Sequence, residues 1–350
     1  PHVCALLADI ANNNVQASVS ATLTAARFIA LPKDGCKIRP IAIGDSWLKL
    51  AATCQLSKVM PEVRSLFHGL QYGVGERGGA EHIIHHARKL FASMPNAAIL
   101  TLDCTNAFNS VSRAAVAAAL LSTPQFASLA PLFMLEYATS SALFGEDYQL
   151  SSKTGVRQGS VLGPFWFALA VHASAQQTLR KFPGVNMFLY LDDVTLVGDP
   201  ATVTAAASEL EAKFAAINLS INRAKSEWLS RTGIAAPRGF ATPKAIRVLG
   251  GYIGPDSECR SALLAMLKRQ ETFFRRLDLV DTDAAGPILG MAGVPRASFI
   301  ARTHHPDVAL PYLRAFDSSV VKAWCSLADL VGACAPTTAH RSPFRPRGGK

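Results

Sequence analysis

The sequence lacks the features that mark membrane-spanning, secreted and zinc-binding proteins. No uninterrupted apolar run approaches the roughly 18 residues that a spanning helix needs. The amino terminus begins with Pro1 and shows no basic segment followed by an apolar one and a cleavage site. The seven cysteines stand singly, without a Cys-x-x-Cys pair, so a zinc ribbon is not indicated. We therefore expect an intracellular protein with no membrane partner, and the absent initiating Met suggests a piece of a longer chain.

Length, composition and charge predict a large folded protein. With 350 residues, 49% of them hydrophobic, the chain can bury a sizeable core. The formal net charge of +10 favours an acidic partner such as nucleic acid, although charge alone fits any basic protein equally well. Strands and helices mix without regular alternation and without an internal repeat. This mixture predicts an α+β fold with a central antiparallel sheet.

Apolar spacing and turn residues predict where the main elements lie. Residues 21–43 contain two β-prone runs joined by a Pro-Lys-Asp-Gly turn, which predicts a basic hairpin. A strand is predicted over 98–103, and a hairpin over 188–197 with Asp192 and Asp193 at its tip. Helices are predicted over 45–60, 80–92, 113–121, 126–139, from Pro164 onward and over 200–217, and the chain becomes mostly helical after Ser257.

Three carboxylates form a candidate metal site. An isolated Asp-Asp pair is equally well explained by a solvated turn. Here, however, Asp103 also ends an apolar strand, and in an antiparallel sheet that strand end can lie beside the hairpin of Asp192 and Asp193. Carboxylates from separate strands can hold two Mg²⁺ ions, or Mn²⁺ as a substitute, for chemistry at phosphorus. We predict Asp103 and Asp192 as bridging ligands and Asp193 as an auxiliary, with Lys33 and Arg39 neutralising a triphosphate.

Six short motifs follow one another within residues 25–255. They are Arg39-Pro-Ile, Leu102-Asp-Cys-Thr-Asn-Ala-Phe-Asn-Ser-Val111, Gly155-Val-Arg-Gln-Gly-Ser-Val-Leu-Gly-Pro164, Tyr190-Leu-Asp-Asp193, Asn222-Arg-Ala-Lys-Ser-Glu-Trp228 and Val248-Leu-Gly-Gly-Tyr252. Their order and spacing resemble the polymerase domain of reverse transcriptases, most closely those of non-LTR (LINE-type) retrotransposons. Asn109 and Ser160 stand where the family often has Asp, but neither change removes a predicted metal ligand.

The resemblance implies a right-hand polymerase with fingers, palm and thumb. Residues 1–95 would form an amino-terminal segment and fingers, and residues 96–255 a palm with inserted fingers helices. Residues 256–335 would form a helical, thumb-like region, and residues 336–350 a disordered basic tail. No nuclease motif or zinc-ligand cluster is present in the sequence, so we expect any target-cleaving activity of the parent protein to lie outside these 350 residues.

By the same resemblance, the protein is an RNA-directed DNA polymerase that extends the 3′-hydroxyl of a DNA or RNA primer with dNTPs on an RNA template. Phe108 would exclude the ribose 2′-hydroxyl, and Lys225 would protonate the pyrophosphate leaving group. Without the motifs, Phe108 is better explained as a core residue, and Lys225 equally well as an exposed lysine. The remaining implied contacts are Arg157, Gln158, Gly159 and Tyr190 with nucleotide or template, and Leu249, Gly250 and Gly251 as the primer grip.

Two other functions stay open from the sequence. An RNA-dependent RNA polymerase would share the metal chemistry, but Phe108 and Tyr190 argue against ribonucleotides. A catalytically inactive or domesticated domain that only binds RNA is a different class of function. Retention of Asp103, Asp192 and Asp193 argues against it, although a recently inactivated copy would look the same. For a eukaryotic retroelement we expect a nuclear location.

Overall fold

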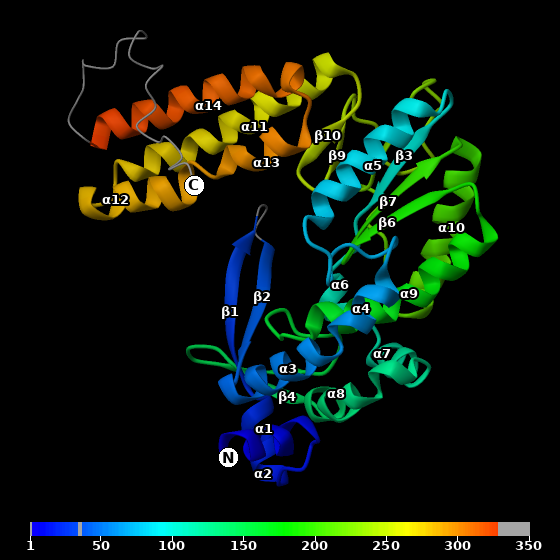
Figure 1. The fold of residues 1–350 in the computed structure, drawn as a ribbon, viewed down its shortest axis with the longest axis vertical. Coiled ribbons are helices and arrows are strands. Elements are labelled where there is room, and N and C mark those ends of the chain that lie inside the picture. Colours follow the sequence, from blue (N-terminus) through cyan, green and yellow to red (C-terminus); the bar gives the residue numbers. More distant parts are fainter. Residues whose placement is uncertain (1, 34–36, 328–350) are drawn as a thin grey trace. The chain divides into compact units, whose positions relative to one another are not determined.

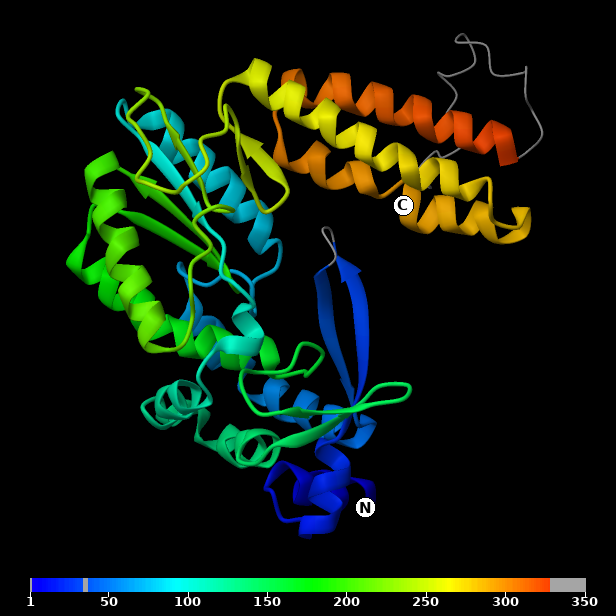
Figure 2. The same cartoon turned by 180° about the vertical axis from the view of Figure 1, so that it is seen from behind.

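The computed structural model describes residues 2–33 and 37–327 (Figures 1 and 2). The chain divides into two compact units, Pro1–Thr242 and Pro243–Lys350. This division groups residues 246–253, which we assigned to the palm, with the helical region that follows them. The boundary at residue 95 between fingers and palm stays a prediction, and the predicted tail, 336–350, lies outside the described residues.

A four-stranded antiparallel sheet lies at the centre of the first unit, which confirms the predicted α+β fold. Its strands, in spatial order, are β6 (Asn186–Tyr190), β7 (Asp193–Gly198), β3 (Ala98–Leu102) and β8 (Glu227–Ser230). The strands β3 and β7 are in register from Ala98 opposite Gly198 to Leu102 opposite Val194. That register brings the ends of the two strands together at Asp103 and Asp193, where the predicted site lies.

Helices pack against this sheet because its strands are apolar on both faces. Leu100 and Leu196 belong to the main core, with α9 (Gly163–Lys181) and α10 (Pro200–Ala216) packed beside them. Helix α5 (Gly79–Ser93) also packs on β3, β6 and β7 (Figure 1). The aromatic side chain of Phe188 in β6 stacks on His86 of this helix. Asp199 begins α10 as predicted, since its carboxylate accepts the backbone N–H groups of Ala201 and Thr202.

The fingers region contains the predicted basic hairpin and a second hairpin that the sequence did not predict. Strands β1 (Ala26–Lys33) and β2 (Lys37–Gly44) pair antiparallel, and β1 also pairs in parallel with β4 (Ser141–Phe144), which pairs with β5 (Gln149–Ser152). The helices of this region are α1 (His2–Ala11), α2 (Ala17–Thr24), α3 (Ser46–Lys58), α4 (Met60–Phe67), α6 (Ala107–Ser110), α7 (Arg113–Leu121), η1 (Pro124–Leu129) and α8 (Ala130–Tyr137).

The second unit is a hairpin followed by helices with a core of their own. Its elements are β9 (Ile246–Val248), β10 (Gly251–Ile253), α11 (Asp256–Leu277), α12 (Thr282–Ile288), the π-helical turn η2 (Leu289–Gly293), α13 (Arg296–Thr303) and α14 (Pro306–Leu327). Helix α11 is amphipathic, because Leu263 and Phe274 are buried with Tyr312 and Phe316 while most of its basic side chains are exposed. No helix among residues 2–33 and 37–327 is long and apolar enough to span a bilayer.

Candidate active site

A cleft of about 720 Å³ lies within the first unit, where the fingers hairpin faces the palm. Nine of the predicted site residues line it: Lys33, Arg39, Asp103, Phe108, Arg157, Gln158, Gly159, Asp192 and Lys225. Tyr190 and Asp193 belong to the adjacent hairpin but are not among the lining residues. The structure therefore brings together residues from five of the six motifs, while the primer-grip motif belongs to the second unit.

Asp103 follows β3 and is held through its backbone by the motif that carries Lys225. The N–H of Asp103 donates to Ser226 Oγ at 3.1 Å, and the Asp103 carbonyl accepts the N–H of Asn222 at 2.7 Å. Ser226 is fully buried, and its hydroxyl donates in turn to the Asn222 carbonyl at 2.9 Å. Two residues far from β3 in the chain thus hold the Asp103 backbone, which fixes the position from which its carboxylate extends.

Asp192 lies in the turn between β6 and β7. Tyr190 pairs with Asp193, so the two-residue turn consists of Leu191 and Asp192, and Asp193 is the first residue of β7. The predicted tip, Asp192 with Asp193, was therefore wrong by one residue. Leu191 adopts a left-handed conformation with φ of 55°, which is unusual for a residue with a large side chain. A buried glutamine, Gln71, accepts the Leu191 N–H at 2.9 Å.

The charges of this site act on one another. Burial raises the pKa of the Asp192 carboxyl, and the carboxylate of Asp103 raises it further, while Lys33 and Arg39 pull it down. Burial, with the nearby carboxylates of Asp192, Asp103 and Asp193, also raises the pKa of the Cys104 thiol to about 12. The negative charges are thus concentrated on the side of the cleft that carries Asp103 and Asp192. Lys33 and Arg39, on the fingers hairpin, stabilise the charged form of Asp192.

A divalent cation fits the Asp103–Asp192 pair on the chemistry of its donors. Among the described residues, no set of three or more His, Cys, Asp or Glu side chains comes together as a metal site. The pair in the cleft consists of two hard oxygen donors whose mutual repulsion a cation would relieve, and Mg²⁺ commonly binds one or two carboxylates plus substrate phosphates. Asp193 as an auxiliary ligand stays a prediction.

Phe108 forms one wall of the cleft and is fixed from behind. Its ring stacks on Phe167 of α9 with centroids 4.7 Å apart and planes at 14°. Its carbonyl accepts the N–H of Val156 at 2.7 Å. Gly155 lies directly against the Phe108–Asn109 backbone with φ of +65°, where a Cβ would collide with it. The glycine-rich loop therefore sets the position of the Phe108 ring.

The Gln158–Gly159 segment of that loop rests against strand β2. The N–H of Ala42 donates to the Gln158 carbonyl at 2.8 Å. Gly159 has φ of +109°, and a Cβ on it would lie 2.5 Å from the Ala42 carbonyl oxygen. Only glycine suits this position, because both its conformation and the close approach exclude a side chain.

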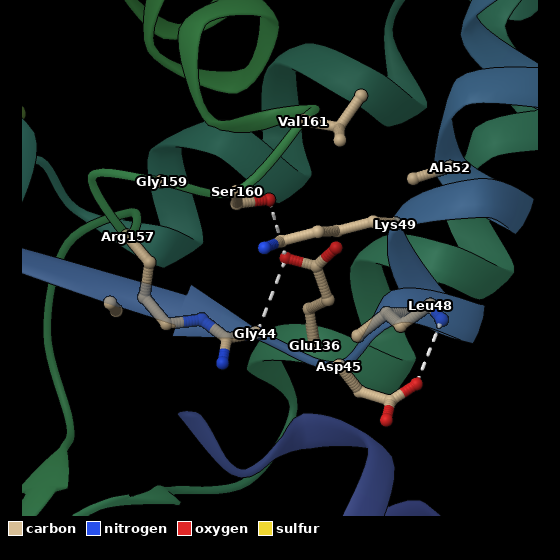
Figure 3. Close-up of a pocket in the computed structure, with 11 residues that line it drawn as sticks. Gly44, Asp45, Leu48, Lys49, Ala52, Glu136, Arg157, Gly159, Ser160 and Val161 are labelled. Carbon is tan, nitrogen blue, oxygen red and sulfur yellow. Dashed lines mark hydrogen bonds and ion pairs between the residues drawn. The ribbon is translucent and has the colours of Figure 1, made fainter. Parts of the chain in front are cut away.

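Arg157 is turned into the protein. Its side chain is 6% exposed, and its guanidinium donates to the Thr24 carbonyl at 2.7 Å and approaches the buried Glu136 carboxylate at 3.4 Å. Ser160 donates to the same carboxylate at 3.0 Å, and the amine of Lys49 points toward it (Figure 3). These internal partners let the Arg157 guanidinium anchor the loop, and the predicted contact of Arg157 with nucleotide or template stays a prediction.

The second unit carries the predicted primer grip. Leu249 and Gly250 form the two-residue turn between β9 and β10, both with positive φ, as a tight hairpin turn requires. Next to it, the N–H of Tyr252 donates to Nε2 of the buried His304 at 3.0 Å. The hairpin is thus bonded to the helical part of its own unit.

Three residues that hold the site were not predicted from the sequence: Gln71, Glu136 and Ser226. One of them carried a usable signal. Glu136 interrupts the apolar run of 132–137, where a lone carboxylate requires a buried partner. Gln71 and Ser226 are polar residues in polar or glycine-rich surroundings, so nothing local distinguishes them.

Comparison with known proteins agrees with the motif-based resemblance. Residues 31–253 match the family model described as "Reverse transcriptase (RNA-dependent DNA polymerase)". A protein of Trypanosoma brucei gambiense, "Retrotransposable element SLACS 132 kDa protein", is 32% identical over 314 residues, covering 86% of this chain. The chain spans only 26% of that protein's length.

Solved structures support the fold. A structure of apo telomerase from Candida tropicalis, truncated from its C-terminal domain, matches with a TM-score of 0.51 and 12% identity, over 69% of this chain and 55% of that one. A second apo telomerase structure from the same organism matches with a TM-score of 0.50 and 8% identity, over 89% and 65%. At such identities the likeness concerns the fold alone. Because the family model covers well over half of the sequence, the chain belongs to the reverse transcriptase (RNA-dependent DNA polymerase) family.

Proposed function

We propose that this chain is the catalytic domain of an RNA-directed DNA polymerase from a non-LTR retroelement, extending a primer 3′-hydroxyl with dNTPs on an RNA template. The observation that carries the proposal is the placement of Asp103 and Asp192 in one cleft, opposite the basic side chains of Lys33 and Arg39. Carboxylates facing cations across such a space suit a metal-bound triphosphate.

The residues that line the cleft have different roles in this reaction. Asp103 and Asp192 hold Mg²⁺, or Mn²⁺ as a substitute, and two such ions, when bound, stabilise the attacking and leaving oxygens at phosphorus. Lys33 and Arg39 bind the triphosphate, and Gln158 with Gly159 lies beside the base and template. The fixed ring of Phe108 excludes a ribose 2′-hydroxyl, which selects deoxynucleotides.

Three further roles rest on position. Lys225 is exposed at the cleft and supplies a proton to the leaving pyrophosphate. In the second unit, Leu249, Gly250 and Gly251 grip the primer, and the exposed basic residues of α11 contact the phosphate backbone. The basic residues are Lys268, Arg269, Arg275 and Arg276. For a eukaryotic retroelement, this activity takes place in the nucleus.

Primer extension tests the proposal. The wild-type chain should extend a primer on an RNA template with dNTPs and Mg²⁺, and Asp192→Asn should reduce the rate by about 1000-fold or more, since several kcal/mol of metal stabilisation are lost. Asp199→Asn is the matched control, because Asp199 caps α10 away from the cleft and Asn also serves as a cap.

Three results would contradict the proposal in different ways. Extension that tolerates Asp192→Asn would exclude the assigned site. Preference for ribonucleotides would identify an RNA-dependent RNA polymerase instead. Tight RNA binding with no extension by the wild-type chain would identify a domain that only binds RNA.

A further inference from the structure

A short segment outside every motif supports the turn that carries Asp192. Residues 70–73 lie alongside the edge strand β6, although they belong to the glycine-rich link before α5. The Leu189 N–H donates to the Leu70 carbonyl and the Tyr72 N–H donates to the Leu189 carbonyl, both at 2.8 Å. The link is therefore paired with the sheet as a short parallel bridge, and Gln71 is brought to the end of β6.

The side chain of Gln71 reaches the turn itself. It is 3% exposed, and its Oε1 accepts two backbone hydrogen bonds at 2.9 Å, from Leu191 N–H and from Gly73 N–H. Its Nε2 has no hydrogen-bond partner within the described part of the chain. Both hydrogen bonds of this buried amide are therefore made by its acceptor oxygen.

The turn needs such support. Leu191, at φ of 55°, occupies a conformation that side chains with a Cβ disfavour, so an external hydrogen bond to its N–H helps to select it over alternatives. Gly73 fits tightly against it, since a Cβ there would lie 2.8 Å from both Leu191 N and Leu191 Cγ. The next residue after Leu191 is Asp192, so a change in the turn moves that carboxylate.

We propose that Gln71 is a positioning residue for polymerisation: through Oε1 it fixes the left-handed turn at Leu191 and thereby the placement of Asp192 opposite Asp103. Gln71 does not line the cleft, so it acts through the turn and not on the substrate. The inference rests on the proposed polymerase function and adds a residue that the family motifs in this sequence do not contain.

Two substitutions of Gln71 separate the acceptor from the bulk of the side chain. Gln71→Met keeps the length but removes the acceptor, whereas Gln71→Glu keeps an acceptor oxygen and replaces the unpartnered amide nitrogen with a second carboxyl oxygen, whose ionisation burial disfavours. Gln71→Met should lower kcat about 100-fold, the scale expected for misplacing a catalytic group by about 1 Å. Gln71→Glu should retain most of the wild-type kcat.

Measurements besides turnover identify a positioning effect. In Gln71→Met, Mn²⁺ binding followed by electron paramagnetic resonance should weaken, whereas the Kd for primer–template should stay within about twofold, because the basic surfaces are unchanged. Gln177→Met is the matched control: Gln177 is exposed and accepts only from Lys213, so kcat should not change.

The outcomes are distinct. A wild-type kcat in Gln71→Met, or equal losses in Gln71→Met and Gln71→Glu, would overturn the inference. If Gln71→Met does not fold, Gly73→Ala tests the same contact, since its Cβ pushes on Leu191; an unchanged kcat in that variant would overturn the inference too. Failure of the wild-type chain to extend any primer would instead refute the proposed function.

Discussion

Removing one partner of the buried pair of Arg157 and Glu136 should strongly destabilise the first unit. Their side chains are 6% and 2% exposed, so replacing Glu136 by Gln leaves a guanidinium in a site of low dielectric constant without its counter-charge. Breaking a buried pair in this way costs about 3–5 kcal/mol. We expect the lower end, about 3 kcal/mol, because Arg157 keeps its bond to the Thr24 carbonyl and its place over the Tyr137 ring.

Thermal and urea unfolding of Glu136→Gln measure this cost. For a unit of the size of Pro1–Thr242, about 3 kcal/mol lowers the Tm by roughly 6–12 °C. The control is Glu211→Gln, which breaks the exposed pair with Arg223 and should cost less than about 1 kcal/mol. The double variant Glu136→Gln with Arg157→Met should lose less than the sum of the single variants by about 1 kcal/mol or more. Equal losses in the Glu136 and Glu211 variants, or simple additivity in the double variant, would refute the reasoning.

Three further predictions concern Phe108 and Gly159 at the cleft and His172 in the core. Phe108→Val removes the ring that stacks on Phe167 and should raise incorporation of ribonucleotides relative to deoxynucleotides, measured as the ratio of kcat/KM values; an unchanged ratio would exclude Phe108 as the gate. Gly159→Ala places a Cβ against the Ala42 carbonyl and should raise the KM for dNTPs several-fold more than that of the primer–template, as steady-state titrations of each would show. Burial lowers the pKa of His172, so below a pH of about 6.5 the unfolded chain binds more protons than the folded one. As the pH decreases, the free energy of unfolding should therefore fall by up to about 1.4 kcal/mol per pH unit. His172→Leu should reduce the difference in the free energy of unfolding between pH 7 and pH 5, measured by urea unfolding, and an equal difference in the variant and the wild type would contradict this.

The sequence predicted well those elements whose pattern is local. Helix α7 matches its predicted bounds, Arg113–Leu121, because an alanine-rich run before Pro124 has strong helix propensity and a clear end. The strand before Asp103 and the β6–β7 hairpin were predicted from apolar runs flanked by turn residues. The predicted helix over 126–139 is divided into η1 and α8, since Pro131 favours a new helical start.

Features that depend on distant contacts were not predictable. The β4–β5 hairpin has short strands with exposed residues, and β4 is fixed by parallel pairing to β1, more than a hundred positions away. The direction of the Arg157 side chain depends in the same way on Glu136 and Thr24. A motif predicts which residue types belong to a site. Whether a given side chain faces the cleft depends on contacts with residues outside the motif.

The site therefore consists of residues that face the cleft and residues that support them from behind. Asp103, Asp192 and Phe108 face the cleft, while Ser226, Gln71 and the Arg157–Glu136 pair hold their backbones or loops from behind. Nucleotidyl transfer depends on placing charges accurately, so both sets are needed for rate. Substitutions in the two sets should affect the stability of the protein differently. Removing a cleft carboxylate relieves repulsion between like charges, whereas removing a supporting residue leaves a buried group without its partner. Substitutions of Asp103 or Asp192 should thus abolish synthesis at unchanged or higher Tm, whereas substitutions of the supporting residues should lower both the rate of synthesis and the Tm.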